Sequence, residues 1–205
     1  MPLVRKPSPS APSQPQDHAA LAVILLQGSD DARWHAARSA GETPNGLAIL
    51  SEAIARESHP RVREAIFTSL ARIRSPESAE VILRYLRSED SNLRTGALDA
   101  LRAMPDAVAA HIPRLLKDDD ADVRLLACEL VRNQPAAATM LGEVLATERE
   151  ANVCAAAIEV LAEAGGPELL PLLAECAARF PNDPFLAFAV RVASERIGSQ
   201  VMTRG

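Results

Sequence analysis

The sequence predicts an all-α solenoid of about five antiparallel helix pairs. Its composition is 48% apolar with 38 Ala but only 3% aromatic, which favours helices over sheets. An apolar residue that opens a helix recurs every 30–32 residues, and a series of prolines recurs every 29–32 residues. One helical hairpin cannot bury both of its faces, so hairpins that share a period must stack on their neighbours.

The first segment, residues 1–16, is predicted to be a disordered tail because it holds five Pro and three Ser. Proline lacks the backbone N–H that helices and sheets use, and this segment has nothing to form a core. A docking motif is the alternative, since Leu3 and Val4 stand beside Arg5 and Lys6. The repeat domain is expected to cover residues 17–197, starting with a lead helix near 18–27.

The first helix of each pair is marked by the apolar series. Small or apolar residues follow each member three or four positions later, which is the spacing of one buried helical face. The openers are Ala32, Val62, Leu93, Val123, Val153 and Phe185, followed by Ala36, Ile66, Ala97, Ala127 and Ala157. Side chains that can cap a first turn precede these helices at Ser29, Ser58, Asp90, Asp120 and Asn182, while the fifth pair lacks a good cap.

The second helix of each pair is predicted to start at a proline, because the first turn does not need the missing N–H. The proline series is Pro44, Pro76, Pro105, Pro135 and Pro167. A closing helix is expected near 183–197, and residues 198–205 are expected to form a flexible C-terminal end.

Three segments resemble the core of a HEAT repeat. They are residues 118–127 (DDDADVRLLA), residues 91–101 (SNLRTGALDAL) and residues 60–66 (PRVREAI). The period of about 30 is similar to that of short bacterial HEAT repeats, which also occur in phycobilisome lyase-like proteins. The resemblance implies a right-handed superhelix whose second helices line the concave side, and it is weak evidence for any one function.

Charge is distributed unevenly along the chain, whose net charge is −5. Residues 56–102 hold nine Arg and seven acids, whereas residues 118–175 hold twelve acids and three Arg. Nucleic acid is therefore an unfavoured partner, because binding through phosphates needs a basic surplus. No apolar run is long enough to span a bilayer, and three cysteines without close pairs do not form a disulfide framework. We expect a cytoplasmic protein without membrane insertion.

Two sets of residues are singled out for binding and for structure. Exposed second-helix positions and their neighbours are predicted to bind a partner: Glu52, Arg84, Tyr85, Arg87, His111, Arg114, Glu143 and Glu175. An arginine that follows four of the openers is predicted to form a structural ladder at Arg33, Arg63, Arg94 and Arg124, with Asp30, Glu57, Asp90 and Asp120 as carboxylate partners. Phosphate binding by this ladder is the alternative.

No catalytic residue, metal site or cofactor is predicted. The four histidines form no His-Glu pair of the kind used by deoxyhypusine hydroxylase, a HEAT-repeat enzyme, and the run of Asp118, Asp119, Asp120 and Asp122 is interpreted as helix capping rather than as a cation site. Cys128 is assigned to the core, while Cys154 and Cys176 could be partly exposed.

We therefore expect a non-enzymatic scaffold or adaptor that binds another protein on its concave face, in bacterial regulation or signalling. The alternatives are a phycobilin lyase-like enzyme subunit and a nucleic-acid-binding protein similar to the HEAT-like alkylpurine DNA glycosylases. The partner's identity and the oligomeric state are left open.

Overall fold

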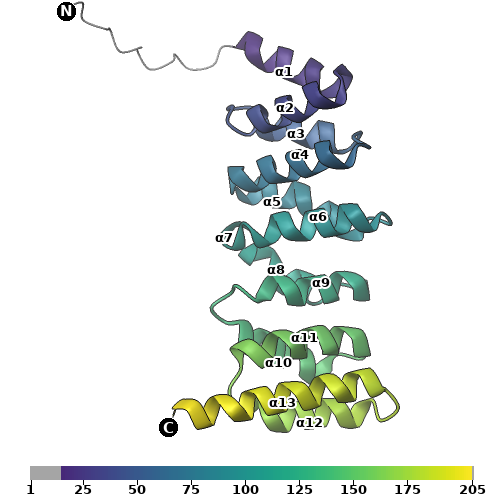
Figure 1. The fold of residues 1–205 in the computed structure, drawn as a ribbon, viewed down its shortest axis with the longest axis vertical. Helices are drawn as coiled ribbons and strands as arrows, with labels where there is room; N and C mark the ends of the chain where they lie inside the picture. Colours follow the sequence, from purple (N-terminus) through teal and green to yellow (C-terminus); the bar gives the residue numbers. More distant parts are fainter. Residues whose placement is uncertain (1–14, 205) are drawn as a thin grey trace, which may run out of the picture. The chain divides into compact units, whose positions relative to one another are not determined.

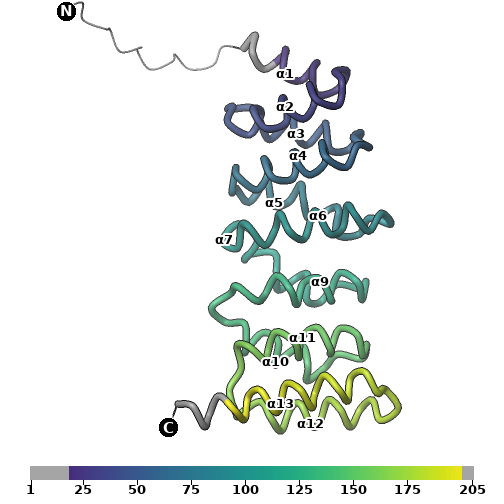
Figure 2. Tube along the Cα trace, viewed as in Figure 1, coloured from purple at the N-terminus to yellow at the C-terminus, as the bar shows by residue number. Residues whose placement is uncertain are grey.

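The structure is a computed structural model that describes residues 15–204, with side chains described for residues 19–199. The docking motif considered in the tail lies outside the described residues. Every regular element within residues 15–204 is a helix, which confirms the all-α class (Figures 1 and 2). The chain divides into two compact units, of which the first ends at Ile73 and the second begins at Arg74.

The first unit consists of helices packed around a small aliphatic core. Each of α2 and α3 contacts both α1 and α4, so the helices stack on their sequence neighbours. The core side chains include Ala37, Leu50, Ile66 and Leu70, all without solvent exposure. The described helices of this unit are α1 (Pro15–Gln27), α2 (Asp30–Ala40), α3 (Gly46–Ile54) and α4 (Pro60–Ile73).

The second unit repeats the same arrangement with more helices. Its first helices pack in chain order, α6 on α9, α9 on α11 and α11 on α13, while α10 contacts α12 in the other layer (Figure 1). The described elements are α5 (Pro76–Leu83), η1 (Arg84–Arg87), α6 (Ser91–Arg102), α7 (Pro105–Val108), η2 (Ala109–His111), α8 (Ile112–Leu115), α9 (Ala121–Val131), α10 (Ala137–Thr147), α11 (Ala151–Ala164), η3 (Pro167–Leu169), α12 (Leu170–Arg179) and α13 (Pro184–Arg204).

Three of the five predicted N-cap side chains form the expected cap, those of Ser29, Asp90 and Asp120. Ser29 accepts from the N–H of Ala32 at 3.3 Å, and Asp90 and Asp120 each accept from the N–H two residues on at 2.9 Å. Glu150 before α11 forms no side-chain cap, as expected for the fifth pair. At α13 the prediction of Asn182 was wrong by one residue, because Asp183 accepts from the N–H of Leu186 at 2.9 Å.

The proline series starts the second element of a pair at three positions and precedes it at two. Pro76, Pro105 and Pro167 occupy the first turn of α5, α7 and η3. Pro44 and Pro135 instead lie in turns that lead directly into α3 and α10, each proline two residues before its helix begins. The N–H of the residue two positions after each proline donates to the carbonyl of the residue before it, at 3.0 and 3.1 Å. This places proline at the second position of a β-turn, where its fixed φ is favoured.

Three of the predicted openers are buried, Ala32 and Leu93 are half-buried, and the opener of the last described helix is exposed. Val62, Val123 and Val153 are buried, whereas Phe185 is 66% exposed and Leu186 is fully buried instead. The core register of α13 is therefore shifted by one residue from the repeat period. The helix also continues to Arg204, beyond the predicted end at residue 197. Among the described residues, no helix combines the length and apolar character needed to cross a bilayer.

Candidate protein-binding site

A cavity of about 350 Å³ opens on the second-helix side of unit 2, between η1 and α8. We call it the arginine cavity. Arginines and acids form its rim, while leucines and a valine form its floor. Its lining residues are Glu80, Leu83, Arg84, Arg87, Arg114, Leu115, Asp118 and Val123.

Local sequence fixes where Arg84 and Arg87 point. A capping box starts α5, with Ser75 and Ser78 each accepting from the other's N–H at 3.1 Å. At its other end the chain tightens into the 3-10 helix η1, whose Leu86 is buried while Arg84 and Arg87 are exposed. The buried leucine therefore sets the rotation of this turn, and both guanidinium groups face solvent at the rim.

Helix α8 supplies Arg114 from the opposite side of the cavity. Ile112 and Leu115 are buried, which turns Arg114 outward to 67% side-chain exposure. Its Nη2 lies 4.0 Å from Oε2 of Glu80, and Nδ1 of His111 lies 3.4 Å from the same oxygen. Exposed ion pairs of this kind contribute little to stability, about 0–1 kcal/mol. The contact with Glu80 therefore leaves Arg114 able to bind a partner.

Arg87 is more firmly held than the other two rim arginines. It pairs with Asp118, whose side chain is only 11% exposed, and its Nη1 lies 3.8 Å from Oδ2 of Asp120. Asp118 is itself fixed, because its Oδ1 accepts from the N–H of Asp120 at 3.0 Å. Arg84 has no ion pair within the described part of the chain. The cavity therefore presents Arg84 and Arg114 as available cations above an apolar floor.

The structure brings together half of the residues predicted to bind a partner. Arg84, Arg87 and Arg114 line the arginine cavity, and His111 contacts it through Glu80. Tyr85 is half-buried on η1 and does not line the cavity. The remaining acids are exposed elsewhere, Glu52 on α3 of unit 1, Glu143 on α10 and Glu175 on α12.

Sequence reasoning missed Glu80 and Asp118 as members of this site. Glu80 stands four residues before Arg84 on the same helical face, so helical spacing could have identified it. Asp118 was assigned to helix capping along with its neighbours. In the structure Asp120 is the N-cap of α9, whereas Asp118 faces the cavity.

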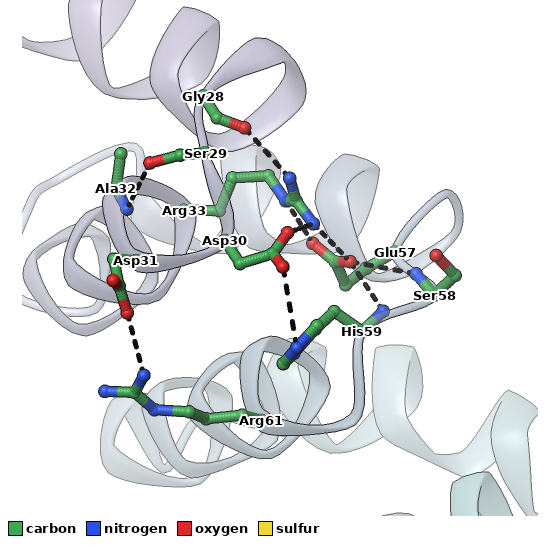
Figure 3. Close-up of polar contacts among 10 residues, drawn as sticks. All are labelled: Gly28, Ser29, Asp30, Asp31, Ala32, Arg33, Glu57, Ser58, His59 and Arg61. Carbon is green, nitrogen blue, oxygen red and sulfur yellow. Dashed lines mark hydrogen bonds and ion pairs between the residues drawn. The ribbon is translucent and has the colours of Figure 1, made fainter.

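The arginine series forms buried contacts at the loops that precede the first helices. Arg33 donates to both carboxylate oxygens of Glu57, from Nε at 2.8 Å and from Nη2 at 3.1 Å (Figure 3). It also donates to Asp30 and to the Gly28 carbonyl, each at 2.9 Å. Oε1 of Glu57 accepts in turn from the N–H groups of Ser58 and His59, at 2.9 and 2.8 Å. One carboxylate thus connects α2 to the loop before α4.

The same arrangement recurs in unit 2 between Arg124 and Glu148, and we call each instance a loop clamp. Nε and Nη2 of Arg124 donate to the two Glu148 oxygens at 2.8 and 3.0 Å, and Oε1 accepts from the N–H groups of Arg149 and Glu150. In both clamps the acid follows the arginine by 24 residues. Sequence reasoning named Asp120 rather than Glu148, although the 24-residue spacing was available as a signal.

The other two members of the series contact loop carbonyls. Nε of Arg63 donates to the Glu57 carbonyl at 2.7 Å, and Nη1 of Arg94 donates to the Ser88 carbonyl at 2.5 Å. Arg124 makes the equivalent bond to the Asp118 carbonyl at 2.8 Å. Each of these carbonyls lies six residues before its arginine, so the first helix fixes the loop that leads into it.

The clamps alter the acidity of their carboxyls. Burial raises the pKa of Glu148, but hydrogen bonds from Arg124 and from two loop N–H groups lower it more, so its pKa lies below the usual value. Glu57 behaves in the same way with Arg33, His59 and Ser58. Both carboxyls are therefore ionised at neutral pH.

A second set of ion pairs, which sequence reasoning missed, joins the other ends of the first helices in unit 2. Arg102 of α6 pairs with Glu129 of α9, and Arg132 pairs with both Glu129 and Glu163. Arg196 of α13 lies 3.8 Å from Glu163. These alternating charges connect four successive first helices, so most first-helix arginines of this unit serve the scaffold.

All three cysteines are free and buried, which corrects the expectation that Cys154 and Cys176 could be partly exposed. A hydrogen bond from Cys154 lowers the pKa of Cys176 to about 7 against the effect of burial, and the nearby Arg179 lowers it further. The charged neighbour that shifts the pKa of Cys176 is therefore Arg179, on the next turn of α12, rather than Glu175, which is adjacent in sequence.

Stacked helical hairpins with a period of about 30 residues define an α-helical repeat protein. The family model described as HEAT repeats matches residues 19–102 and residues 47–129, which together make up more than half of the chain. The chain therefore belongs to the HEAT-repeat family, and the predicted α-solenoid class is confirmed.

Solved structures and curated proteins were also compared with this chain. Two engineered proteins from the Northeast Structural Genomics Consortium are similar to this chain. The first is 20% identical with a TM-score of 0.42, and the aligned region covers 89% of this chain and 97% of the engineered chain. The second is 19% identical with a TM-score of 0.41, and the aligned region covers 89% of this chain and 99% of the engineered chain. YibA of E. coli is 20% identical with a TM-score of 0.42, and the aligned region covers 87% of this chain and 81% of the YibA chain. The comparison with curated proteins finds no match.

Proposed function

We propose that this chain is a non-enzymatic scaffold that binds an acidic segment of a partner protein at the arginine cavity. The observation that supports this most directly is the position of Arg84, Arg87 and Arg114 around a floor of Leu83 and Leu115. Helical repeat proteins generally bind partners along the extended surface that their repeats create. Six of the eight lining residues lie on second-helix elements, which the HEAT resemblance assigns to the concave side.

The chemistry of the rim favours carboxylates. A guanidinium group presents a planar fork of N–H donors that matches a carboxylate, and Arg84 and Arg114 are both exposed. Leu83 and Leu115 can receive an apolar side chain next to the acid, and arginine is enriched among residues that dominate binding energy. The partner segment we propose therefore combines acidic and aliphatic residues.

A short acidic segment suits this protein better than a nucleic acid. The chain carries a net charge of −5, and residues 118–175 are strongly acidic, so an extended polyanion would meet repulsion beyond the cavity. A short segment needs only the local arginines. A cytoplasmic location remains part of the proposal, supported by the absence of a disulfide framework in the sequence.

The test is charge reversal at the cavity with a matched control. The double variant Arg84→Glu plus Arg114→Glu and the control Arg191→Glu would be compared with the wild type. Arg191 is also exposed and lies in the same unit, on α13, away from the cavity. Each protein would be used for affinity capture from its native host and titrated with labelled acidic peptides by fluorescence anisotropy.

The proposal expects one protein to be captured near stoichiometry by the wild type and the control but not by the double variant. Peptides that combine acidic and aliphatic residues should likewise bind the wild type and the control but not the double variant, and their binding should weaken at high salt. If the double variant retains both the captured protein and the peptides, the arginine cavity is not the binding site. Preferential, salt-dependent binding of duplex DNA would contradict the choice of an acidic protein segment.

A further inference from the structure

A second charged cavity, of about 270 Å³, lies in unit 1 between α2 and α4. It is separate in sequence from the arginine cavity and shares no residue with it. Its rim carries three arginines and one acid around the indole of the chain's single tryptophan. The lining residues are Trp34, Arg38, Arg61, Glu64, Ala65, Thr68, Ser69 and Arg72.

Two of the arginines contact the face of Trp34. The guanidinium carbon of Arg61 lies 4.5 Å from the ring centroid, and that of Arg38 lies 4.9 Å from it. Such a cation–π contact restrains the guanidinium plane while leaving its N–H edge free to donate. Trp34 is only half-buried, and a tryptophan beside arginines at a surface is typical of binding hot spots. The indole therefore acts as a platform that orients two sets of donors.

The internal partners of these arginines are exposed. Nη1 of Arg61 lies 2.8 Å from Oδ1 of Asp31 (Figure 3), and the Asp31 side chain is 79% exposed. Nη1 of Arg72 lies 4.0 Å from Oε1 of Glu42, which is similarly exposed. Exposed pairs are readily exchanged for a ligand that is held by several donors at once. Arg38 forms no ion pair within the described part of the chain.

The floor of the cavity supplies further polar groups. Thr68 is exposed on α4, and Ser69 is 1% exposed with a hydroxyl that has no hydrogen-bond partner among the described residues. A buried hydroxyl without a partner is unfavourable, and native structures usually satisfy such groups. This second observation, independent of the arginines, indicates a polar ligand rather than an apolar one.

We propose that this cavity binds a phosphomonoester dianion, either as a phosphorylated side chain or as a small free phosphate. The lining carries three guanidinium charges and one carboxylate, and a phosphomonoester, which carries about −1.5 to −2 at neutral pH, would replace Asp31 and Glu42 as the partner of Arg61 and Arg72. Its three terminal oxygens can accept from donors on both helices, whereas a carboxylate offers two oxygens and one charge. The cavity is smaller than the roughly 300–1,000 Å³ of sites for drug-sized ligands, which suits one such group.

Trp34 makes the test direct, because it is the chain's only tryptophan and lines the cavity. The full chain would be titrated with inorganic phosphate and with a phosphoserine peptide while tryptophan fluorescence is recorded. The unphosphorylated peptide, acetate and chloride at matched ionic strength serve as comparison ligands. Calorimetry would be run alongside, since replacing Arg61 changes the surroundings of the fluorophore itself.

The variants are Arg38→Gln and Arg61→Gln, with Arg56→Gln as the matched control. Arg56 is also an exposed arginine of unit 1, but it pairs with Glu52 at 3.2 Å and does not line the cavity. Saturable binding of phosphate or phosphopeptide is expected, weakened about tenfold or more by either cavity variant and unchanged by the control. Circular dichroism would verify that each variant is folded.

The outcomes separate the two sources of the ligand and the ways in which the proposal fails. Tighter binding of the phosphopeptide than of inorganic phosphate assigns the site to a phosphorylated protein, and the reverse order assigns it to a small anion. No saturable response to either ligand overturns the proposal, as does an equal response to acetate or chloride. Cavity variants that bind as well as Arg56→Gln would also overturn it. None of these results bears on the arginine cavity, which lies in the other unit.

Discussion

Replacing Glu148 with Ala removes the acceptor of four hydrogen bonds at the loop between α10 and α11. Two come from Arg124, and two come from the backbone N–H groups of Arg149 and Glu150. The side chains of Arg124 and Glu148 are only 15% and 7% exposed. The substitution therefore leaves a mostly buried guanidinium without its carboxylate and two loop N–H groups without their acceptor.

The expected loss follows from what remains after the substitution. Removing one member of a buried ion pair typically costs about 3–5 kcal/mol. Arg124 keeps hydrogen bonds to the carbonyls of Asp118 and Asp119, at 2.8 and 3.1 Å, so the lower end applies. We expect Glu148→Ala to lower the free energy of unfolding by about 3 kcal/mol. Glu148→Gln keeps one oxygen acceptor and should cost about 1–2 kcal/mol.

Urea denaturation followed by circular dichroism measures these differences, with Glu143→Ala as the control. Glu143 is exposed on α10 in the same unit, and its replacement should change stability by less than about 0.5 kcal/mol. Because repeat arrays can unfold in parts, hydrogen exchange at the amides of Arg149 and Glu150 should be followed as well, and it should accelerate. A Glu148→Ala variant no less stable than Glu143→Ala would refute the clamp as a stabilising contact.

Three further predictions concern acidity, backbone space and thiol reactivity. Because the pKa of Glu148 is lowered in the folded chain, its ionised carboxylate stabilises the fold above the unfolded pKa of about 4.3, and this stabilisation is lost as pH falls through the lower folded pKa. Acid should therefore destabilise the wild type more than Glu148→Gln. Urea midpoints measured between about pH 5 and pH 3 would show the difference. A Cβ on Gly46 would lie 1.9 Å from the Ala40 carbonyl oxygen, so Gly46→Ala should cost about 1–3 kcal/mol in urea denaturation. A Cβ on Gly142 would meet only Leu172, at 3.8 Å, so Gly142→Ala should stabilise α10 by up to about 1 kcal/mol in the same measurement. Cys176 and Cys128 are both fully buried, so their alkylation requires local opening of the fold. Because Cys154 and Arg179 lower the pKa of Cys176 to about 7 while burial raises that of Cys128 to about 12, Cys176 should react first, and peptide mass spectrometry would detect a reversed order.

The period of the sequence was sufficient to predict the helices of this fold. Residues such as Ala36, Ile66, Ala97, Ala127 and Ala157 recur on one face, and all are buried. Hydrophobic spacing is a local property of the chain, so it can be recognised without tertiary information. It fails at Phe185, where the helix starts one residue later than the period requires and Leu186 takes the core position. A shift of one residue at a single helix leaves too little repetition to be detected from the sequence.

The arginine cavity could be predicted only in part. Helical position identified Arg84 and Arg114 as exposed, because their neighbours Leu83 and Leu115 are core residues. The roles of Glu80 and Asp118 depend on how η1 and α8 approach one another, which the interrupted second helix of the third pair determines. Pro113, in the first turn of α8, contributes to this interruption, because it cannot donate a backbone hydrogen bond. Side-chain contacts across such an interruption depend on tertiary packing, which the sequence period does not predict.

Residues that recur with the repeat and residues that interrupt it have different roles in this protein. The position that holds Arg33, Arg63, Arg94 and Arg124 contacts a loop carbonyl in every case, so its recurrence is explained by the scaffold. The next position holds Trp34 once and then Glu64, Thr95 and Leu125, so stacking does not require a tryptophan there. Trp34 therefore needs an explanation outside the scaffold, and its contacts with Arg38 and Arg61 supply one. Substitution of Trp34 should consequently leave the helical repeats folded while removing the site that the indole organises.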